Sequence, residues 1–365
     1  MDLSEIRRNN QLEFLNSGAE LQIGNVKDLP LPLEVVRNIN VDSPYVKKCL
    51  SSGLTAIVYQ IEVDGKQYAV KKVRDNILVK NTDGQTSFLN ELQRRKDFEL
   101  FRENNKIIDN GINKTIYGSL LHGVIVTDWI NGNHIDVYNR NILRNMFQLL
   151  NQIHFCGIFE WDLCPGNIML DAKENVILFD FGYSYKFNPL KMYHSNGKEN
   201  PLFHSIERFE TRAFMQYLLD FEKKNGHEMS IELFRIEKEE AVNAYNDRLV
   251  WLKQNDADAD IIETFLHIIE TWENALLSDK NLEELYDLER FRSYVLDIYD
   301  DISGESCTPG TIILIDEVIS LINDKHDFLR ENDAYLWEDK KADKQQLLKK
   351  FTEMLQKAKD LQVKK

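Results

Sequence analysis

Two carboxylates and one amide stand at short intervals in the middle of the chain. Residues 161–182, W-D-L-C-P-G-N-I-M-L-D-A-K-E-N-V-I-L-F-D-F-G, carry Asp162, Asn167 and Asp180, with a strand-turn-strand pattern between the last two. Carboxylate and amide oxygens suit a hard cation such as Mg²⁺, and a carboxylate can also align an acceptor hydroxyl and take its proton. Asp162 could therefore act as a catalytic base, and Asn167 and Asp180 could hold a metal ion.

The elements upstream are predicted to hold a nucleotide against these residues. The stretch L-S-S-G-L-T-A-I-V-Y-Q-I-E-V alternates apolar and polar residues, and Asp64-Gly65 is a strong hairpin signal before K-Q-Y-A-V-K-K-V. Backbone N–H groups of the turn Ser51-Ser52-Gly53 could face phosphates. Lys71 lies on the second strand, and Lys72 should point to the other face because strand side chains alternate.

A helix and two further strands are expected next. Residues 86–103 have helical spacing, and Glu91 falls where it could pair with Lys71; Glu99 is the second choice. Apolar stretches at 115–121 and 123–130 predict strands that complete a five-stranded sheet. Residues 141–154 predict a buried helix that leads into the catalytic stretch.

The order Ala-Val-Lys, helix Glu, Asp-x4-Asn and Asp-Phe-Gly resembles the protein-kinase-like superfamily over about residues 46–225. The resemblance implies an α+β, bilobal fold, with a β-rich N-lobe, a helical C-lobe, and ATP and Mg²⁺ as cofactors. An additional helical region would follow at the C-terminus.

The family's glycine-rich loop matches only in part, because Gly53 is the one glycine of its G-x-G-x-x-G-x-V pattern that is present. The resemblance also implies backbone contacts to adenine from a hinge after the fifth strand. The nucleotide-binding residues that it implies are Ser51, Gly53, Ala56, Val58, Ala69, Lys71, Glu91, Asp128 (carbonyl), Ile130 (N–H) and Met169.

The predicted organisation has four parts. They are an N-terminal extension at 1–45, an N-lobe at 46–130, a C-lobe at 131–235 and a helical C-terminal region at 236–365. The last region carries apolar stripes at helical spacing, which favour core packing or helix pairing. It could also bind a partner.

Three departures from the family pattern stand out. Glu160-Trp161-Asp162 replaces His-Arg-Asp, so the usual arginine partner of an activation-loop phosphate is missing and activation by loop phosphorylation is not expected. Cys164 replaces a lysine that contacts the γ-phosphate. No Ala-Pro-Glu closes the segment after Gly182. The chain resembles divergent, eukaryotic-like kinases of bacteria or phages.

Three functions stay open. The leading hypothesis is a protein kinase that phosphorylates Ser/Thr or Tyr, with autophosphorylation, because a roughly twenty-residue loop after Gly182 looks mobile and carries hydroxyls. These hydroxyls are on Tyr183, Ser184, Tyr185 and Tyr193. The D-x-x-P-G-N-I form instead resembles small-molecule kinases of the aminoglycoside- and choline-kinase type. A pseudokinase scaffold is the third, and the intact Lys71, Asp162, Asn167 and Asp180 argue against it.

The overall composition narrows the classes of binding partner and the cellular location that are expected. A net charge of -15 argues against nucleic-acid binding and against a polybasic membrane surface. The start of the chain lacks a Sec signal, no apolar run reaches membrane-spanning length, and four scattered cysteines suit a reducing compartment. A cytoplasmic protein with a protein substrate is predicted, and export as an effector stays possible.

Overall fold

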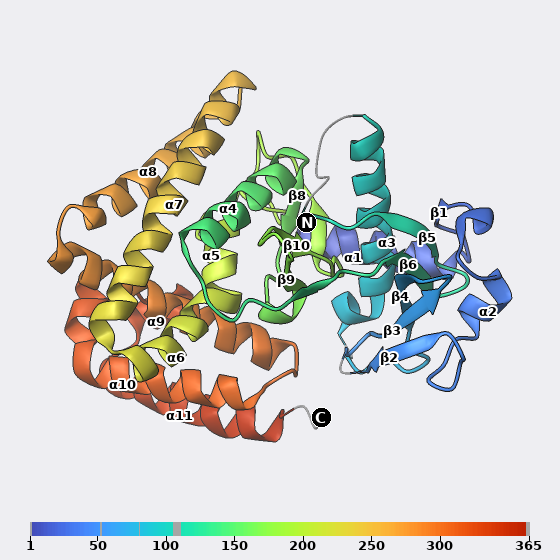
Figure 1. Cartoon of the computed structure of the whole chain (residues 1–365). Coiled ribbons are helices and arrows are strands. Elements are labelled where there is room, and N and C mark those ends of the chain that lie inside the picture. Colours follow the sequence, from blue (N-terminus) through green and yellow to red (C-terminus); the bar gives the residue numbers. More distant parts are fainter. Residues whose placement is uncertain (1, 52, 80, 105–110, 363–365) are drawn as a thin grey trace. The chain divides into compact units, whose positions relative to one another are not determined.

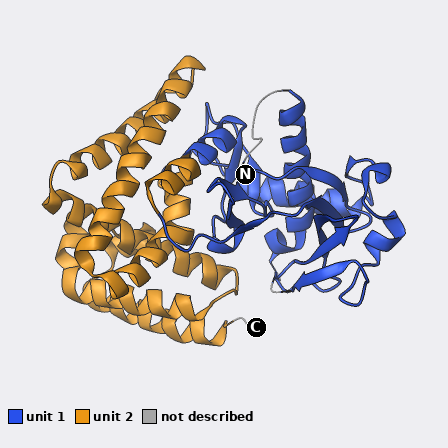
Figure 2. Ribbon diagram, in the orientation of Figure 1, with its two compact units in different colours: residues 1–138, 148–201 blue, residues 139–147, 202–365 orange. Residues whose placement is uncertain are grey.

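The chain forms two compact units in a computed structural model (Figures 1 and 2). The described residues are 2–51, 53–79, 81–104 and 111–362. Unit 1 comprises residues 1–138 and 148–201, and unit 2 comprises residues 139–147 and 202–365. Unit 1 contains antiparallel sheets and unit 2 is helical. The predicted α+β, kinase-like fold class is confirmed, whereas the predicted division into four parts stays a prediction.

Six strands form the main sheet within the described part of unit 1. They are β1 (Gln22–Gly24), β2 (Val46–Leu50), β3 (Ala56–Val63), β4 (Lys66–Val73), β5 (Thr115–Ser119) and β6 (Val124–Asp128). Their order is β1-β5-β6-β4-β3-β2, and every neighbouring pair is antiparallel. Four of these strands, β3, β4, β5 and β6, match strands predicted from the sequence, and β2 was not predicted as a separate strand. β1, from the predicted N-terminal extension, adds a sixth beside β5.

The β3–β4 hairpin determines which side chains face the site. Asp64 and Gly65 have φ values of 51° and 78°, so both occupy the left-handed region that a tight two-residue hairpin turn requires. In the resulting register Val58 lies opposite Lys71. Alternation then sends Val70 into the core on one face of the sheet and Lys71 to the other.

Each face of the sheet has its own apolar cluster. Tyr59, Ile61 and Val70 pack with Leu31 and Val36, which come from the N-terminal segment around α2 (Leu33–Arg37). On the opposite face, Phe88 and Leu92 of α3 pack against Ile23 and Ile125. The N-terminal segment is therefore part of the packing of unit 1.

Helix α3 (Thr82–Glu103) begins four residues before the predicted start. Asn81 is its N-cap, and the Asn81 side chain accepts a hydrogen bond from Gly84 N at 2.7 Å. Gly84 is required here, because an added Cβ would lie 2.3 Å from Val79 Cγ1. Helix α1 (Leu3–Asn16) packs along α3 (Figure 1).

The catalytic stretch lies on small antiparallel sheets. β7 (Gly132–Asn133), β9 (Ile168–Asp171) and β10 (Val176–Leu178) form one sheet, and β8 (Ile158–Glu160) pairs with β11 (Ser184–Lys186). The predicted strand-turn-strand between Asn167 and Asp180 is confirmed as β9 and β10. The predicted helix before the catalytic stretch is α4 (Arg140–Phe155).

The segment after Gly182 differs from the predicted open loop. It contains β11, and Ser184, Tyr185 and Tyr193 are buried, as are His194 and Ser195. A polar sequence can be buried when its polar groups find hydrogen-bond partners. The partners here come from residues far away in the sequence, so local composition could not reveal them.

Seven α-helices make up most of the described part of unit 2. They are α5 (Ser205–Phe209), α6 (Met215–Asn225), α7 (His227–Gln254), α8 (Ala259–Leu276), α9 (Asp279–Ser303), α10 (Pro309–Glu331) and α11 (Lys344–Asp360). The predicted apolar stripes lie in the core: Phe265 and Trp272 of α8 and Phe351 of α11 are buried.

A fully buried lysine lies in the core of unit 2. Lys238 of α7 forms ion pairs with Glu210, Glu237 and Glu289, and its Nζ lies 4.6 Å from the centroid of the Trp272 ring. Burial lowers the pKa of Lys238, but the three carboxylates outweigh it and the pKa lies above its usual value. Lys238 is therefore the charge that compensates this acidic cluster.

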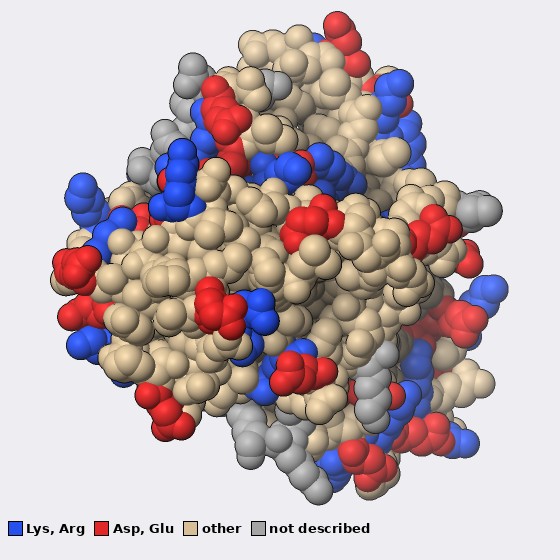
Figure 3. All heavy atoms as spheres, turned by 90° about the vertical axis from the view of Figure 1, so that its right-hand side faces the viewer, with Lys and Arg blue, Asp and Glu red and all other residues tan. Residues whose placement is uncertain are grey.

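A membrane-spanning segment would show among the described helices, and a strongly charged surface would show on a face such as that drawn in Figure 3. Among the residues the structure describes, no helix is both long and apolar enough to cross a membrane. On the face shown in Figure 3, basic and acidic side chains are interspersed.

We expect Lys238→Met to lower the free energy of unfolding by about 3–5 kcal/mol, because it removes the buried cation that pairs with Glu210, Glu237 and Glu289. Urea unfolding followed by circular dichroism measures this change. Lys224→Met, at an exposed position of α6, should stay within about 0.5 kcal/mol of the wild type. Equal stability of the two variants would contradict the assigned role of Lys238.

Candidate active site

Lys71 connects two carboxylates from different elements of unit 1. Its Nζ lies 2.6 Å from Glu91 Oε2 on α3 and 2.8 Å from Asp180 Oδ2, which follows β10. Only 14% of the Lys71 side chain is exposed. Burial lowers the pKa of Lys71, but the attraction of Asp180 and Glu91 outweighs it and leaves the pKa above its usual value. Lys71 is therefore a fixed positive charge.

The choice between the two candidate glutamates is settled by the structure. Glu91 holds Lys71 with one carboxylate oxygen and accepts a hydrogen bond of 2.8 Å from Arg95 Nε with the other. Glu99 instead pairs with Arg102 and accepts a hydrogen bond from Thr115 N at 2.8 Å. The predicted pairing of Lys71 with Glu91 is thus present.

Asp180 has its carboxylate held at both oxygens. Oδ2 pairs with Lys71, and Oδ1 accepts a hydrogen bond from Gly182 N at 3.2 Å. Burial raises the pKa of Asp180, but the attraction and hydrogen bond of Lys71 outweigh it, so the pKa lies below its usual value. The side chain is a carboxylate at neutral pH, as a metal ligand must be.

Asp162 and Asn167 lie against each other at the start of β9. Asn167 Nδ2 donates to the Asp162 carbonyl at 3.0 Å and to Asp162 Oδ2 at 3.2 Å. These bonds direct Asn167 Oδ1 away from Asp162. The Cys164 thiol, where the family has lysine, donates weakly to Asp162 Oδ2 at 3.8 Å. The proposed base thus has a defined orientation.

Glu160, in place of the histidine of His-Arg-Asp, is a buried anchor for this loop. Its Oε1 accepts a hydrogen bond of 2.8 Å from Asp162 N, and its Oε2 is hydrogen-bonded to the Ser184 hydroxyl of β11. Burial raises the pKa of Glu160 to about 8, and the nearby Asp162 and Asp180 act in the same direction. At neutral pH the group is therefore mainly a neutral carboxylic acid.

Trp161, in place of the arginine, also contacts the segment after Gly182. Its indole N–H donates to Ser195 Oγ at 2.9 Å, and its ring packs on Phe159 and His194. Glu160 and Trp161 together tie the catalytic loop to that segment with hydrogen bonds that need no phosphate.

The residues predicted for the nucleotide occupy one face of the hairpin. Ala56, Val58, Ala69 and Lys71 share the face turned toward α3, because their positions alternate with the core residues of the other face. The turn before β3 is held by Arg74, whose guanidinium donates to the carbonyls of Ser51 and Gly53. Ser52 lies outside the described residues.

The predicted adenine contacts are placed but untested. The Asp128 carbonyl, at the end of β6, accepts hydrogen bonds from Asn113 Nδ2 at 3.3 Å and from Thr127 Oγ1 at 3.1 Å. Ile130 follows in the connection to β7 and is partly buried, and Met169 lies on β9 opposite Ile177. Their roles toward a nucleotide stay predictions.

Sequence reasoning missed two residues of the site. Arg95 binds Glu91 and donates to the Phe179 carbonyl at 2.5 Å; its position four residues after Glu91 on a helix was a usable signal. Asn90 donates to three backbone carbonyls around Gly182. Nothing in the local sequence marks Asn90, because its partners are about ninety residues away.

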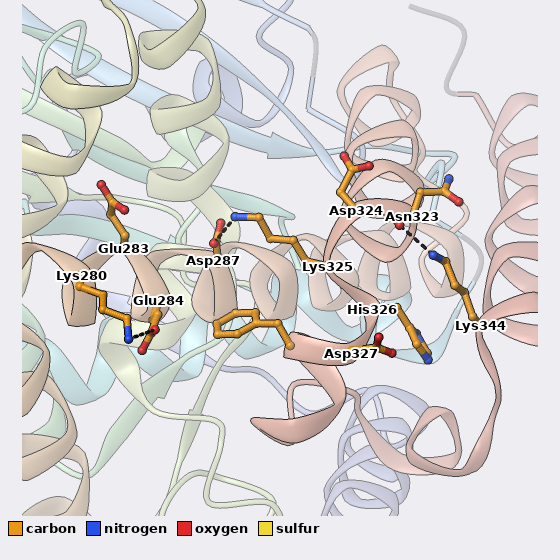
Figure 4. Close-up of a pocket in the computed structure, with 11 residues that line it drawn as sticks. Lys280, Glu283, Glu284, Asp287, Asn323, Asp324, Lys325, His326, Asp327 and Lys344 are labelled. Atoms are coloured by element: carbon orange, nitrogen blue, oxygen red, sulfur yellow. Dashed lines mark hydrogen bonds and ion pairs between the residues drawn. The ribbon is translucent and has the colours of Figure 1, made fainter.

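A cavity of about 430 Å³ lies in unit 2 and contains none of the predicted site residues. Acidic side chains and three lysines line it, and each lysine already has a partner: Lys280 pairs with Glu284, Lys325 with Asp287, and Lys344 donates to the Asn323 carbonyl at 2.8 Å (Figure 4). These pairings leave no lysine aimed at a ligand within this cavity, so it adds nothing to the site.

Glu160→Gln should change how stability depends on pH. Glu160 keeps its proton up to about pH 8 in the folded protein, whereas the unfolded chain releases this proton near the ordinary pKa of 4.5. The stability that the neutral Glu160 contributes is therefore lost as the pH rises from 4.5 to 8. The variant cannot titrate and keeps both hydrogen bonds. Its melting temperature should therefore rise relative to the wild type by on the order of 5 °C between pH 5 and 8.5. Melting curves across this range, with exposed Glu13→Gln as the control, measure it; a constant difference would contradict the raised pKa.

Comparison with known proteins agrees with this geometry. Residues 108–194 match the ABC1 atypical kinase-like domain. That range contains Asp162, Asn167 and Asp180, and the structure brings Lys71 and Glu91, from outside it, to Asp180. No curated protein sequence matches the chain. The domain match, together with the assembled Lys71, Glu91 and Asp180, supports membership of the protein-kinase-like superfamily.

Proposed function

We propose that the chain is an ATP- and Mg²⁺-dependent protein kinase that transfers the γ-phosphate to a hydroxyl side chain of a protein. The domain match by itself supports a kinase-like phosphotransferase or a pseudokinase. The observation that favours an active enzyme is Lys71 held between Glu91 and Asp180, in the same unit as an oriented Asp162. A scaffold would not need all of these groups.

The donor atoms fit Mg²⁺ and nucleotide phosphates. The Asp180 carboxylate and the Asn167 amide oxygen are hard oxygen ligands of the kind that Mg²⁺ prefers. Bound Mg²⁺ would supply positive charge against the β- and γ-phosphates. Lys71 would bind the α- and β-phosphates, and Glu91 keeps its ammonium group in place.

Asp162 would perform the proton step. The acceptor hydroxyl donates its hydrogen bond to the Asp162 carboxylate, which orients the oxygen in line with the γ-phosphorus. The new O–P bond forms as the bond to the bridging oxygen breaks, ADP leaves, and the hydroxyl proton passes to Asp162. Asn167 keeps the Asp162 side chain in the required orientation through its amide N–H.

The segment after Gly182 supports activity without a phosphorylation switch. The hydrogen bonds of Glu160 to Ser184 and of Trp161 to Ser195 hold it against the catalytic loop. In this conformation the hydroxyls of Ser184, Tyr185 and Tyr193 are buried. If autophosphorylation occurs, we expect it at other positions. The proposal also keeps a cytoplasmic location and a partner-binding role for the C-terminal helices.

Phosphate transfer should depend on Asp180. With labelled ATP and Mg²⁺, the wild type should label itself or a generic acceptor protein, and Asp180→Ala should lower the rate by roughly two to three orders of magnitude, because the metal loses a ligand. Asp75→Ala, at an exposed loop position, is the matched control. Phosphoamino-acid analysis of the product distinguishes Ser/Thr from Tyr.

The outcomes of this assay separate the three functions. Label transferred only to small hydroxylated compounds would replace the protein-kinase proposal with a small-molecule kinase. Nucleotide binding without any transfer would leave a pseudokinase scaffold. Mapping of label to Ser184, Tyr185 or Tyr193 would show that the buried segment opens.

Two neighbouring lysines of β4 provide a paired test of the proposed binding of nucleotide phosphates by Lys71. Lys71→Met should weaken transfer by roughly a hundredfold or more, because the phosphates lose a fixed charge. Lys72→Met, on the opposite face of the same strand, should retain at least half of the wild-type rate. Assays of rate together with melting temperature separate catalysis from folding. Equal loss of rate in both variants would contradict the assignment of Lys71 as the residue that binds the nucleotide phosphates.

A further inference from the structure

Helix α1 contacts α3, which carries Glu91, and the segment that follows Asp180-Phe181-Gly182. Arg8 binds Asp83 in the first turn of α3 through Nε and Nη2, with a shortest distance of 2.7 Å from Nη2 to Oδ2. Arg7 lies over the Tyr185 ring, 3.7 Å from its centroid, and donates to Asn196 Oδ1 at 3.1 Å. One helix thus contacts α3 and the segment after Gly182.

A chain of amide hydrogen bonds runs through the same contact. Thr86 Oγ1 donates to Gln11 Oε1 at 3.1 Å, and Gln11 Nε2 donates to Asn90 Oδ1 at 3.2 Å. Asn90 Nδ2 then donates to the carbonyls of Phe181, Gly182 and Ser184, at 3.2, 3.0 and 2.7 Å. Thr86, Gln11 and Asn90 are all buried.

The orientation of each amide in this chain of hydrogen bonds follows from which groups can donate and which can accept. Backbone carbonyls only accept hydrogen bonds, so the Asn90 NH₂ group must face them and its oxygen must face Gln11. The Gln11 NH₂ group must then face Asn90, which leaves its oxygen for the Thr86 hydroxyl. Removal of Gln11 takes away the donor to the buried Asn90 Oδ1, whereas the Thr86 hydroxyl keeps the Thr82 carbonyl as an acceptor at 3.0 Å.

We propose that Gln11 and Asn90 are positioning residues, through which α1 holds Glu91 and Asp180 together in the arrangement that binds Mg²⁺ and ATP. Asn90 is the neighbour of Glu91 on α3, and its three acceptors surround the turn that follows Asp180. α1 thereby stabilises the arrangement that an activation-loop phosphate stabilises in other kinases. This chain has Trp161 in place of the arginine that would bind such a phosphate. This inference rests on the proposed function, since it assigns the regulation of the same site.

The proposal predicts a specific kinetic pattern. The hydrogen bonds through Gln11 and Asn90 are called the relay below. If the relay only sets the fraction of molecules in the conformation that binds ATP, its loss raises the apparent KM for ATP in proportion, and saturating ATP restores that conformation. Gln11→Ala should therefore raise the KM for ATP about tenfold and lower kcat less than threefold. A merely structural role would lower kcat through loss of folded protein and leave KM unchanged.

The experiment uses four variants of the full chain: Gln11→Ala, Asn90→Ala, the double variant, and Asn10→Ala. Asn10 is an exposed neighbour on the same helix and serves as the control. Three quantities are measured: KM and kcat with Mg²⁺-ATP, affinity for a fluorescent ATP analogue with Mg²⁺, and hydrogen exchange of peptides that cover residues 82–92 and 179–186.

The proposal is supported if Gln11→Ala and Asn90→Ala each weaken nucleotide affinity about tenfold and speed hydrogen exchange in these peptides. The double variant should bind nucleotide no more weakly than Asn90→Ala, because both residues act through one chain of hydrogen bonds. Asn10→Ala should match the wild type. An additive, roughly hundredfold loss in the double variant would overturn the relay, as would wild-type affinity and exchange in Gln11→Ala. If the wild type transfers no phosphate, the proposed function fails while affinity and exchange still decide the relay.

Discussion

The ion pairs of Lys71 are the constraint on which the structure of unit 1 depends. A lysine with little exposed surface needs anionic partners, because an uncompensated buried charge costs several kcal/mol. Glu91 and Asp180 supply them, and Arg95 balances the second oxygen of Glu91, so two cations face two carboxylates. Strand β4, helix α3 and the turn after β10 must all be in place at once for this arrangement to form.

The chain stabilises its catalytic loop without the usual charged switch. Where the superfamily pattern has histidine and arginine, Glu160 and Trp161 reach Ser184 and Ser195 through hydrogen bonds. Burial keeps Glu160 mainly protonated at neutral pH, so no anion is left uncompensated beside Asp162 and Asp180. Hydrogen bonds of this kind are always present in the folded state, whereas a phosphate must be added by another reaction.

The sequence predicted those features that depend on local spacing. The β3–β4 hairpin follows from Asp64-Gly65, and β9 and β10 follow from the strand-turn-strand pattern between Asn167 and Asp180. It missed β1, because three residues are too few to show a period, and it placed the start of α3 too late because Gly84 weakens the helical signal. The segment after Gly182 was misjudged because its polar side chains are buried by distant partners.

The sequence by itself determined the chemistry of the candidate site, because Lys71, Asp162, Asn167 and Asp180 are recognisable from residue type and short-range order. Only the tertiary structure decided how that chemistry is held together. Contacts between residues 20 to about 110 positions apart pair Lys71 with Glu91 and Asp180, link Trp161 to Ser195 and connect Gln11 to Asn90. Such contacts are selected by burial and hydrogen-bond geometry in three dimensions, and no local pattern encodes them.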